Sequence, residues 1–174
     1  MSERYLPASE FLNYVIAGEI AFEDSPLAEA NLRQLLEMVD DSDRSNRDWA
    51  AFVISGLPLD TPEIRDALLK AADGGDPDTR DEAIIGLARR DRHAALIRLA
   101  PLLNEELGVM LLEAATILGD PSLVPALKEM ENWEGEDNQI REQLRLAIAA
   151  CERGVGEDGW PDAGERAYCL SNRD

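Results

Sequence analysis

The residues whose spacing comes closest to that of a metal site form an acidic turn, Asp73-Gly-Gly-Asp-Pro-Asp-Thr-Arg-Asp81. Closely spaced carboxylates suit Ca²⁺, but a calcium loop also needs the order Asp-x-Asp-x-Asp-Gly and a bidentate glutamate. The turn has neither. Short acidic side chains are instead favoured at helix N-termini, where they accept hydrogen bonds from free N–H groups. The turn therefore predicts helix capping, and no metal site is expected.

The side chains that could act as nucleophiles or general bases are the single histidine, His93, and the cysteines Cys151 and Cys169. One histidine and two distant cysteines are too few for a transition-metal site, and none stands in a nucleophile motif. Paired carboxylates such as Glu105-Glu106 are so common here that they do not distinguish a general acid from a solvated surface. Gly74-Gly75 lacks the spacing and the lysine of a phosphate loop. We therefore expect no enzyme activity and no cofactor.

The charge balance restricts the possible partners, because 36 acidic residues face 17 basic ones and the formal net charge is −19. Nucleic-acid binders neutralise phosphates with clustered lysine and arginine, so this sign excludes nucleic acid as the expected partner. An anionic membrane surface would repel the chain for the same reason. Two interpretations stay open. The charge gives solubility, or it forms an acidic face that attracts a basic partner and speeds association.

The N-terminal residues and the cysteines indicate a cytoplasmic protein. The first ten residues contain no basic segment followed by an apolar one, and no apolar run approaches the length of a membrane span. Cys151 and Cys169 lack the CxxC spacing, so they are interpreted as reduced thiols. The oligomeric state is left open.

The elements that must position any site are helices, arranged as a repeat. Between residues 62 and 127 the chain repeats an Ala/Leu-rich helix, an acidic turn and a second such helix. Corresponding positions recur roughly every 31–33 residues, a spacing found in helical solenoids. Alanine and leucine are strong helix formers, and aromatic residues make up only 5% of the chain. An all-α repeat array of this kind usually holds partners on an extended surface.

The chain is long enough for one well-buried domain, which we place at residues 1–152. Residues 1–24 are expected to form an N-terminal cap with a helix over about 9–18, and residues 25–152 the repeats. Ser25-Pro26 and Thr61-Pro62 each read as an N-cap followed by proline at the first helical position. Residues 153–174, which are rich in glycine, are expected to form a flexible or loosely docked tail that includes Trp160. The remaining helices are expected from about residue 46, and over 76–88, 93–103, 105–118, 119–127 and 140–151.

Two segments resemble HEAT repeats, of the short bacterial type first described in phycobilisome lyases. They are Ala-Ile-Ile-Gly-Leu-Ala-Arg at 83–89 and Leu-Gly-Asp-Pro-Ser-Leu-Val-Pro-Ala-Leu at 118–127. The family's arginine before the second helix is matched by Arg47 and Arg80, and its Asp-Pro turn by Asp76-Pro77 and Asp120-Pro121. The resemblance covers roughly residues 25–152. It implies a right-handed α-α superhelix, a HEAT-like solenoid of about four helix pairs.

The resemblance also implies a binding face, since the second helices of HEAT arrays line the concave surface. Trp49 aligns with Glu82 of the next repeat, and Phe52 with Ile85, so the two aromatic side chains either pack in the core or anchor a partner. Carried over by position, the partner-binding face comprises Asp48, Trp49, Phe52, Glu82, Ile85, Arg89, Glu113, Thr116 and Arg145.

These observations favour a non-catalytic protein-binding module whose acidic concave face binds a basic protein. An immunity or inhibitor protein of a bacterial toxin system would fit, because such proteins often cover a cationic nuclease. An accessory or lyase-like HEAT protein that binds a tetrapyrrole is the alternative, and so is a scaffold subunit of a larger complex.

Overall fold

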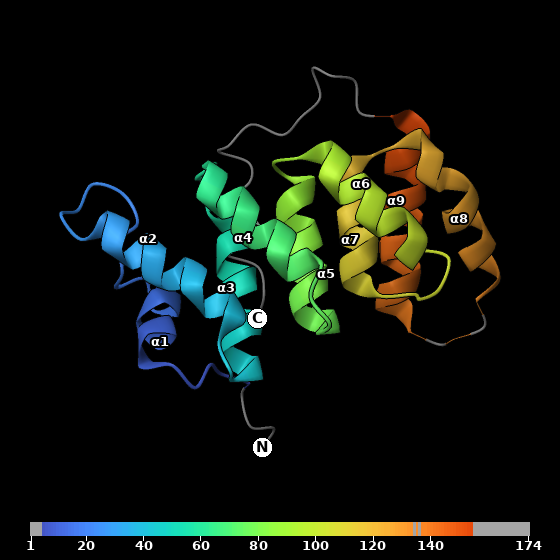
Figure 1. The fold of residues 1–174 in the computed structure, drawn as a ribbon. Coiled ribbons are helices and arrows are strands. Elements are labelled where there is room, and N and C mark those ends of the chain that lie inside the picture. The colour runs from blue at the N-terminus through green and yellow to red at the C-terminus, as the bar shows by residue number, and fades with distance from the viewer. Residues whose placement is uncertain (1–4, 134, 136, 155–174) are drawn as a thin grey trace. The chain divides into compact units, whose positions relative to one another are not determined.

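The computed structural model describes residues 5–133, 135 and 137–154, and these residues form helices without any strand (Figure 1). The expected all-α class is therefore confirmed. The tail expected over 153–174, with Trp160 and Cys169, lies outside the described residues from residue 155 onward. The chain divides into two compact units between Ala83 and Ile84.

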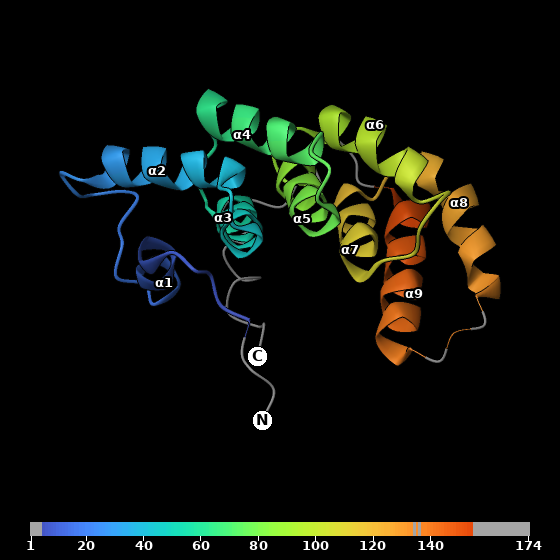
Figure 2. The same ribbon diagram turned by 60° about the horizontal axis from the view of Figure 1, so that its bottom comes forward.

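The first unit contains α1 (Glu10–Ile16), α2 (Ala28–Glu37), α3 (Arg44–Gly56), α4 (Pro62–Ala72) and the start of α5 (Pro77–Ala88). A 3-10 turn, Met38–Asp40, ends α2. Within this unit α2 and α4 form one layer, and α1 and α3 form a second layer against it (Figure 2). Such a two-layer arrangement buries the apolar stripe of each helix.

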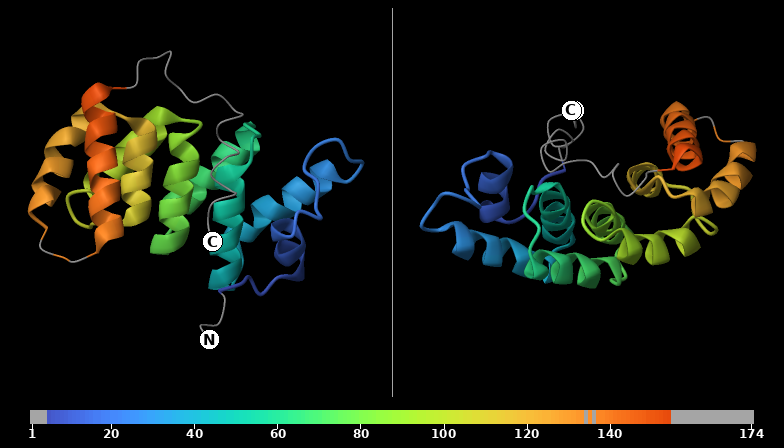
Figure 3. Two further views of the ribbon diagram at one scale, coloured as in Figure 1. Left: turned by 180° about the vertical axis from the view of Figure 1, so that it is seen from behind. Right: turned by 90° about the horizontal axis from the view of Figure 1, so that it is seen from above.

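The second unit contains the end of α5, then α6 (Arg92–Leu102), α7 (Val109–Leu118), α8 (Val124–Glu129) and α9 (Asn138–Arg153). The 3-10 turns Pro121–Leu123 and Met130–Asn132 flank α8. Helices α7 and α9 lie side by side and share the most extensive helix contact, with α8 packed on α9 and α6 on α7 (Figure 3).

The helix starts follow local capping chemistry. Thr61 accepts a hydrogen bond from the backbone N–H of Ile64 at 3.4 Å and Pro62 opens α4, as expected. Pro77 likewise opens α5. The prediction for Ser25-Pro26 was wrong by about two residues, because the Ser25 hydroxyl accepts from Leu27 N–H at 3.2 Å in a turn and α2 begins only at Ala28.

The helix expected over 105–118 also starts later, at Val109. Gly108 is extended (φ −140°, ψ 144°) and forms its N-cap. The backbone N–H groups of Glu105 and Glu106 both donate to the carbonyl oxygen of Leu102 at 2.9 Å and so satisfy the C-terminal end of α6. The two glutamates therefore lie in a loop instead of on the first turn of a helix.

The core of each unit is built from leucine, isoleucine and alanine, in agreement with the composition. In the first unit Leu12, Leu35, Ile54, Ile64 and Leu68 are fully buried. In the second unit the fully buried side chains include Leu99, Leu112, Leu118, Leu127 and Ala147. Burial of a leucine side chain contributes about 1.5–3 kcal/mol, so these positions dominate the stability of the helices that carry them.

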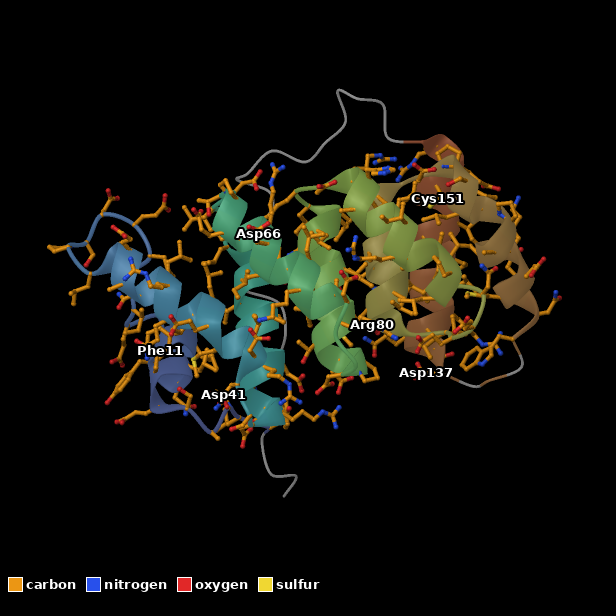
Figure 4. The ribbon with its side chains drawn as sticks, in the orientation of Figure 1. Phe11, Asp41, Asp66, Arg80, Asp137 and Cys151 are labelled. Atoms are coloured by element: carbon orange, nitrogen blue, oxygen red, sulfur yellow. The ribbon has the colours of Figure 1, made fainter. Side chains whose placement is uncertain are left out.

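Cys151 is part of this core, with its side chain fully buried. It lies near the end of α9, far from Asp137 at the start of that helix (Figure 4), and its thiol donates to the carbonyl oxygen of Ala115 at 3.4 Å. Burial raises the pKa of the Cys151 thiol to about 11. At pH 8 the thiolate, which is the nucleophile, is therefore much scarcer than for an ordinary exposed thiol.

We predict that Cys151, observed in a Cys169→Ser background, reacts with Ellman's reagent at pH 8 only after unfolding in guanidinium chloride. Because the pKa is raised in the folded state, its contribution to stability is present below pH 9 and is lost as the pH rises toward 11. Rapid labelling of the folded variant at pH 8, compared with free glutathione, would contradict a buried thiol.

Candidate functional site

Asp48, the first residue of the expected partner-binding face, is a buried hydrogen-bond acceptor. It lies on α3 and is 8% exposed. Its Oδ2 accepts from the Tyr5 hydroxyl at 2.6 Å and its Oδ1 from the Thr79 hydroxyl at 2.6 Å. Desolvation, followed by the hydrogen bond to Asp48, raises the pKa of Tyr5 to about 12. Asp48 therefore joins the N-terminal segment and the start of α5 to α3.

Two arginines at the start of α3 extend this network to the acidic turn. Arg47 donates to the carbonyl oxygens of Asp41 at 2.9 Å and Ser42 at 3.2 Å, and to Asp76 Oδ2 at 2.9 Å. Arg44 pairs with Asp76 at 3.5 Å and also with Asp78. The carboxylates of the acidic turn, whose spacing could suggest a calcium site, therefore bind arginine side chains. No group of three potential metal ligands occurs in the described part of the chain.

Trp49 and Phe52 lie three residues apart on α3 and contact each other. Their ring centroids are 5.6 Å apart in an edge-to-face arrangement with an interplanar angle of 89°. Both are half-buried, and Trp49 Nε1 is a buried donor with no acceptor among the described residues. The pair therefore shares features of a core contact and of an anchor, and its role in partner binding stays a prediction.

The other expected residues differ in exposure: three are buried, Glu113 and Thr116 are half-buried, and Arg145 is exposed. Glu82, Ile85 and Arg89 are buried, with exposed fractions of 6%, 1% and 5%. Arg89 pairs with Glu113 at 3.3 Å, so the structure brings these two together. The Thr116 hydroxyl donates within α7 to the carbonyl oxygen of Leu112 at 2.8 Å.

Arg145 on α9 is exposed and pairs with Glu142 on the same helix. Of the nine expected residues, it is the one that the structure leaves exposed.

A hollow that the sequence does not indicate lies in the second unit. It has a volume of about 380 Å³ and lies between the loop after α6 and the α8 segment. Its apolar lining residues are buried or half-buried and are called its floor, its exposed glutamates are called its rim, and none of the described residues that line it is basic. The apolar lining residues are Leu103, Leu107, Ala126, Met130 and Trp133, and the polar ones are Asn104, Glu105, Glu106, Glu129 and Asn132.

Trp133 in this hollow is positioned by two neighbours in sequence. A Cβ atom at Gly135 would lie 1.9 Å from Cζ2 of the Trp133 ring, so the backbone of residue 135 passes directly against the indole. The Arg141 guanidinium lies 5.8 Å from the ring centroid and donates to the carbonyl oxygen of Gly135 at 2.6 and 3.2 Å. The indole is therefore held against the loop by contacts on two sides.

We predict that Gly135→Ala displaces the Trp133 ring, because the added methyl group cannot share its space. The Trp133 indole N–H resonance should shift in a ¹⁵N-edited NMR spectrum, while the free energy of unfolding should fall by less than about 1 kcal/mol in this half-exposed loop. Gly75→Ala is the matched control, since nothing lies within 4 Å of a Cβ atom there. An unchanged Trp133 resonance would show that the ring does not lie against residue 135.

Sequence reasoning missed the hollow because Glu105 and Glu106 were assigned to a helix. The signal that could have found the loop is Gly108, since a glycine between two apolar stretches often marks a helix end. Trp133 lies between the helices expected over 119–127 and 140–151, but neither its neighbours nor its depth could be inferred from spacing.

Comparison with known proteins gives distant relatives and no family. The chain matches no protein-family model. Over 112 residues it is 32% identical to Protein YibA of Escherichia coli strain K12 and equally to Protein YibA of strain O157:H7, a match that covers 64% of this chain. The chain spans 40% of the length of these curated relatives.

One of these relatives has a solved structure. The X-ray structure of E. coli YibA is similar with a TM-score of 0.60 at 28% identity, over 83% of this chain and 55% of that one. Among the described residues, no helix is long and apolar enough to cross a membrane.

Proposed function

We propose that this chain is a non-catalytic protein-binding module that uses an acidic surface to bind a basic protein. The observation that carries the proposal is that most described basic side chains are already paired with a carboxylate of the same chain, which leaves an excess of acidic groups for a partner. The paired residues are Arg33, Arg44, Arg47, Arg65, Lys70, Arg80, Arg89, Arg92, Lys128 and Arg145.

The remaining negative charge acts on a partner mainly through long-range attraction. With a formal net charge of −19, the chain steers a basic protein toward itself and raises the association rate at low ionic strength. Surface charges are screened over about 8 Å at physiological salt. Binding is therefore expected to weaken as salt is added.

The fold proposed for this module is a HEAT-like solenoid, a right-handed superhelix with pairs α2–α3, α4–α5, α6–α7 and α8–α9. The two-layer packing of the first unit supports it, as do the contacts of α6 with α7 and of α8 with α9 in the second unit and the contact of Arg47 with the next acidic turn at Asp76. A bacterial toxin of cationic character, with this chain as its cytoplasmic immunity protein, is the partner class that the charge suits best.

The test is affinity capture of partners from the native lysate at low and high salt, with identification by mass spectrometry. One basic protein retained at low salt and weakened at high salt supports the proposal. It fails if the purified candidate partner binds equally well at both salts, or if no protein is retained at either. Size-exclusion chromatography with light scattering on the same sample identifies retention that comes only from self-association.

The charge variants for this test must be chosen by exposure. Charge reversal at Glu82 or Glu113 would disturb a buried group or the pair with Arg89. Exposed glutamates, such as Glu19 and Glu37 in the first unit and Glu105 and Glu129 in the second, change the surface charge without removing an ion pair among the described residues.

A further inference from the structure

We propose that the hollow lined by Leu103, Glu105, Glu129 and Trp133 receives a lysine or arginine side chain from an exposed peptide segment of the partner. This inference rests on the proposed function and gives it a specific place. The argument depends on three properties of the hollow: its apolar floor, the arrangement of its carboxylates and the absence of a basic residue from its described lining.

The floor suits the aliphatic stem of a basic side chain. Leu103, Leu107, Met130 and the Trp133 ring present apolar surface, and lysine and arginine bury their methylene groups on such surface while the charged head stays near polar atoms. Because Gly135 and Arg141 hold the ring in place, little side-chain entropy is lost on binding.

The carboxylates suit an organic cation better than a metal ion. Glu105 and Glu106 come from the loop after α6, whereas Glu129 comes from the end of α8, so negative charge approaches the hollow from two elements. The described residues contain no group of three acidic, histidine or cysteine side chains close enough to hold a metal. A guanidinium or ammonium group on a long stem can reach carboxylates that are spread around a rim.

None of the described residues that line the hollow is basic. Lys128, next to Glu129, is turned to Glu152 and pairs with it at 2.6 Å. Arg141, whose guanidinium lies 5.8 Å from the Trp133 ring centroid, is not one of the lining residues and donates to the carbonyl oxygen of Gly135. Glu105 and Glu129 are exposed and form no ion pair with a basic side chain in the described part of the chain.

A second hollow shows the contrast. In the first unit a space of about 650 Å³ is lined by Tyr5, Asp43, Arg44, Ser45 and Asp78. There the Arg44 guanidinium already pairs with Asp78, and the carboxylates around it raise the pKa of Arg44. That hollow holds its own basic group, so a partner's cation would meet a competing positive charge there.

The direct test is NMR titration of the full ¹⁵N-labelled chain with two capped peptides, Ac-Gly-Leu-Arg-Leu-Gly-NH₂ and the matched Ac-Gly-Leu-Gln-Leu-Gly-NH₂. The arginine peptide should shift the Trp133 indole N–H, assigned with Trp133→Phe, and the amides of residues 103–107 and 126–133. The glutamine peptide should bind at least fivefold more weakly, since it lacks the charge. Equal shifts from both peptides, or shifts spread evenly over the chain, would overturn the inference.

A second test measures the affinity of the arginine peptide for variants that lack surface carboxylates. Glu105→Gln/Glu129→Gln should weaken the arginine peptide three- to tenfold, because two of the three rim charges are removed without loss of volume. Glu19→Gln/Glu37→Gln makes the same change in net charge at exposed positions in the first unit and should leave the affinity within about twofold. An equal loss in both variants would mean that only the overall charge matters.

The same two variants separate this inference from the proposed function. If a captured basic partner binds Glu105→Gln/Glu129→Gln as tightly as the original chain, the module binds proteins but not through this hollow. If the arginine peptide occupies the hollow while no protein is captured at either salt, the hollow binds basic side chains and the proposed function fails.

Discussion

Asp48→Ala is expected to lower the free energy of unfolding by about 3 kcal/mol, although Asp48 was assigned to a partner-binding face on sequence grounds. The substitution leaves the Thr79 hydroxyl, which is only 3% exposed, without its acceptor at 2.6 Å, and it also removes the acceptor of Tyr5. A buried donor left unsatisfied costs about 1–3 kcal/mol. The Asp48→Ala substitution also removes a carboxylate that lies 3.8 Å from the Arg44 side chain.

Urea unfolding followed by circular dichroism measures this loss of stability. Two further variants test whether the loss comes from the hydrogen bonds that Asp48 accepts. Asp48→Asn keeps the shape and one acceptor oxygen, so it should cost less than alanine. Thr79→Val combined with Asp48→Ala should cost less than the sum of the single changes, because the valine removes the orphaned hydroxyl. Asp66→Ala, an exposed site on α4, should stay within about 0.5 kcal/mol. A cost for Asp48→Ala as small as that of Asp66→Ala would show that the network is not formed.

Leu112→Ala should have a comparable or larger effect in the second unit, about 2–5 kcal/mol. Leu112 is fully buried on α7, the helix in most extensive contact with α9. Removal of its isobutyl group loses transfer free energy and leaves a cavity that the surrounding helices fill only in part. Thermal and urea unfolding of the variant give the magnitude.

Ile97→Ala is the matched control for this prediction. Ile97 has the same number of side-chain carbons as leucine but is 54% exposed on α6, so its truncation should cost less than about 1 kcal/mol. Similar losses at the two positions would mean that α7 is not packed in a core. Because Asp48 and Leu112 lie in different units, the two variants together also report whether the units unfold in one transition.

The sequence predicted those features that depend on neighbouring residues. Thr61-Pro62 was read correctly, and so was the helix start at Pro77, because an N-cap and a proline act within one turn of helix. The all-α class followed from the alanine and leucine content in the same local way. Ser25 was misread because its hydroxyl can cap a helix or close a turn, and the residues alone do not decide between the two.

The environment of the candidate residues could not be predicted, since it depends on contacts between distant positions. The partners of Asp48 are 43 and 31 residues away in sequence, so its assignment to an open face could not be checked by spacing. Arg89 and Glu113 were both predicted as partner-binding residues, but their mutual pairing was not foreseen. The hollow beside Trp133 required the loop at Glu105 and the close approach of Gly135, neither of which leaves a periodic signal.

The position of the boundary between the two units decides how this chain can be cut and re-engineered. It falls between Ala83 and Ile84, within α5, and not in a connecting loop. A cut there would remove the acceptors of about four successive backbone N–H groups. It would also create a new terminus at Ile84, Ile85 and Leu87, which are at most 1% exposed, so the separately produced halves should aggregate. An inserted affinity tag, or the new chain ends of a circular permutant, should instead be placed at the exposed Gly74-Gly75 turn, a few residues upstream.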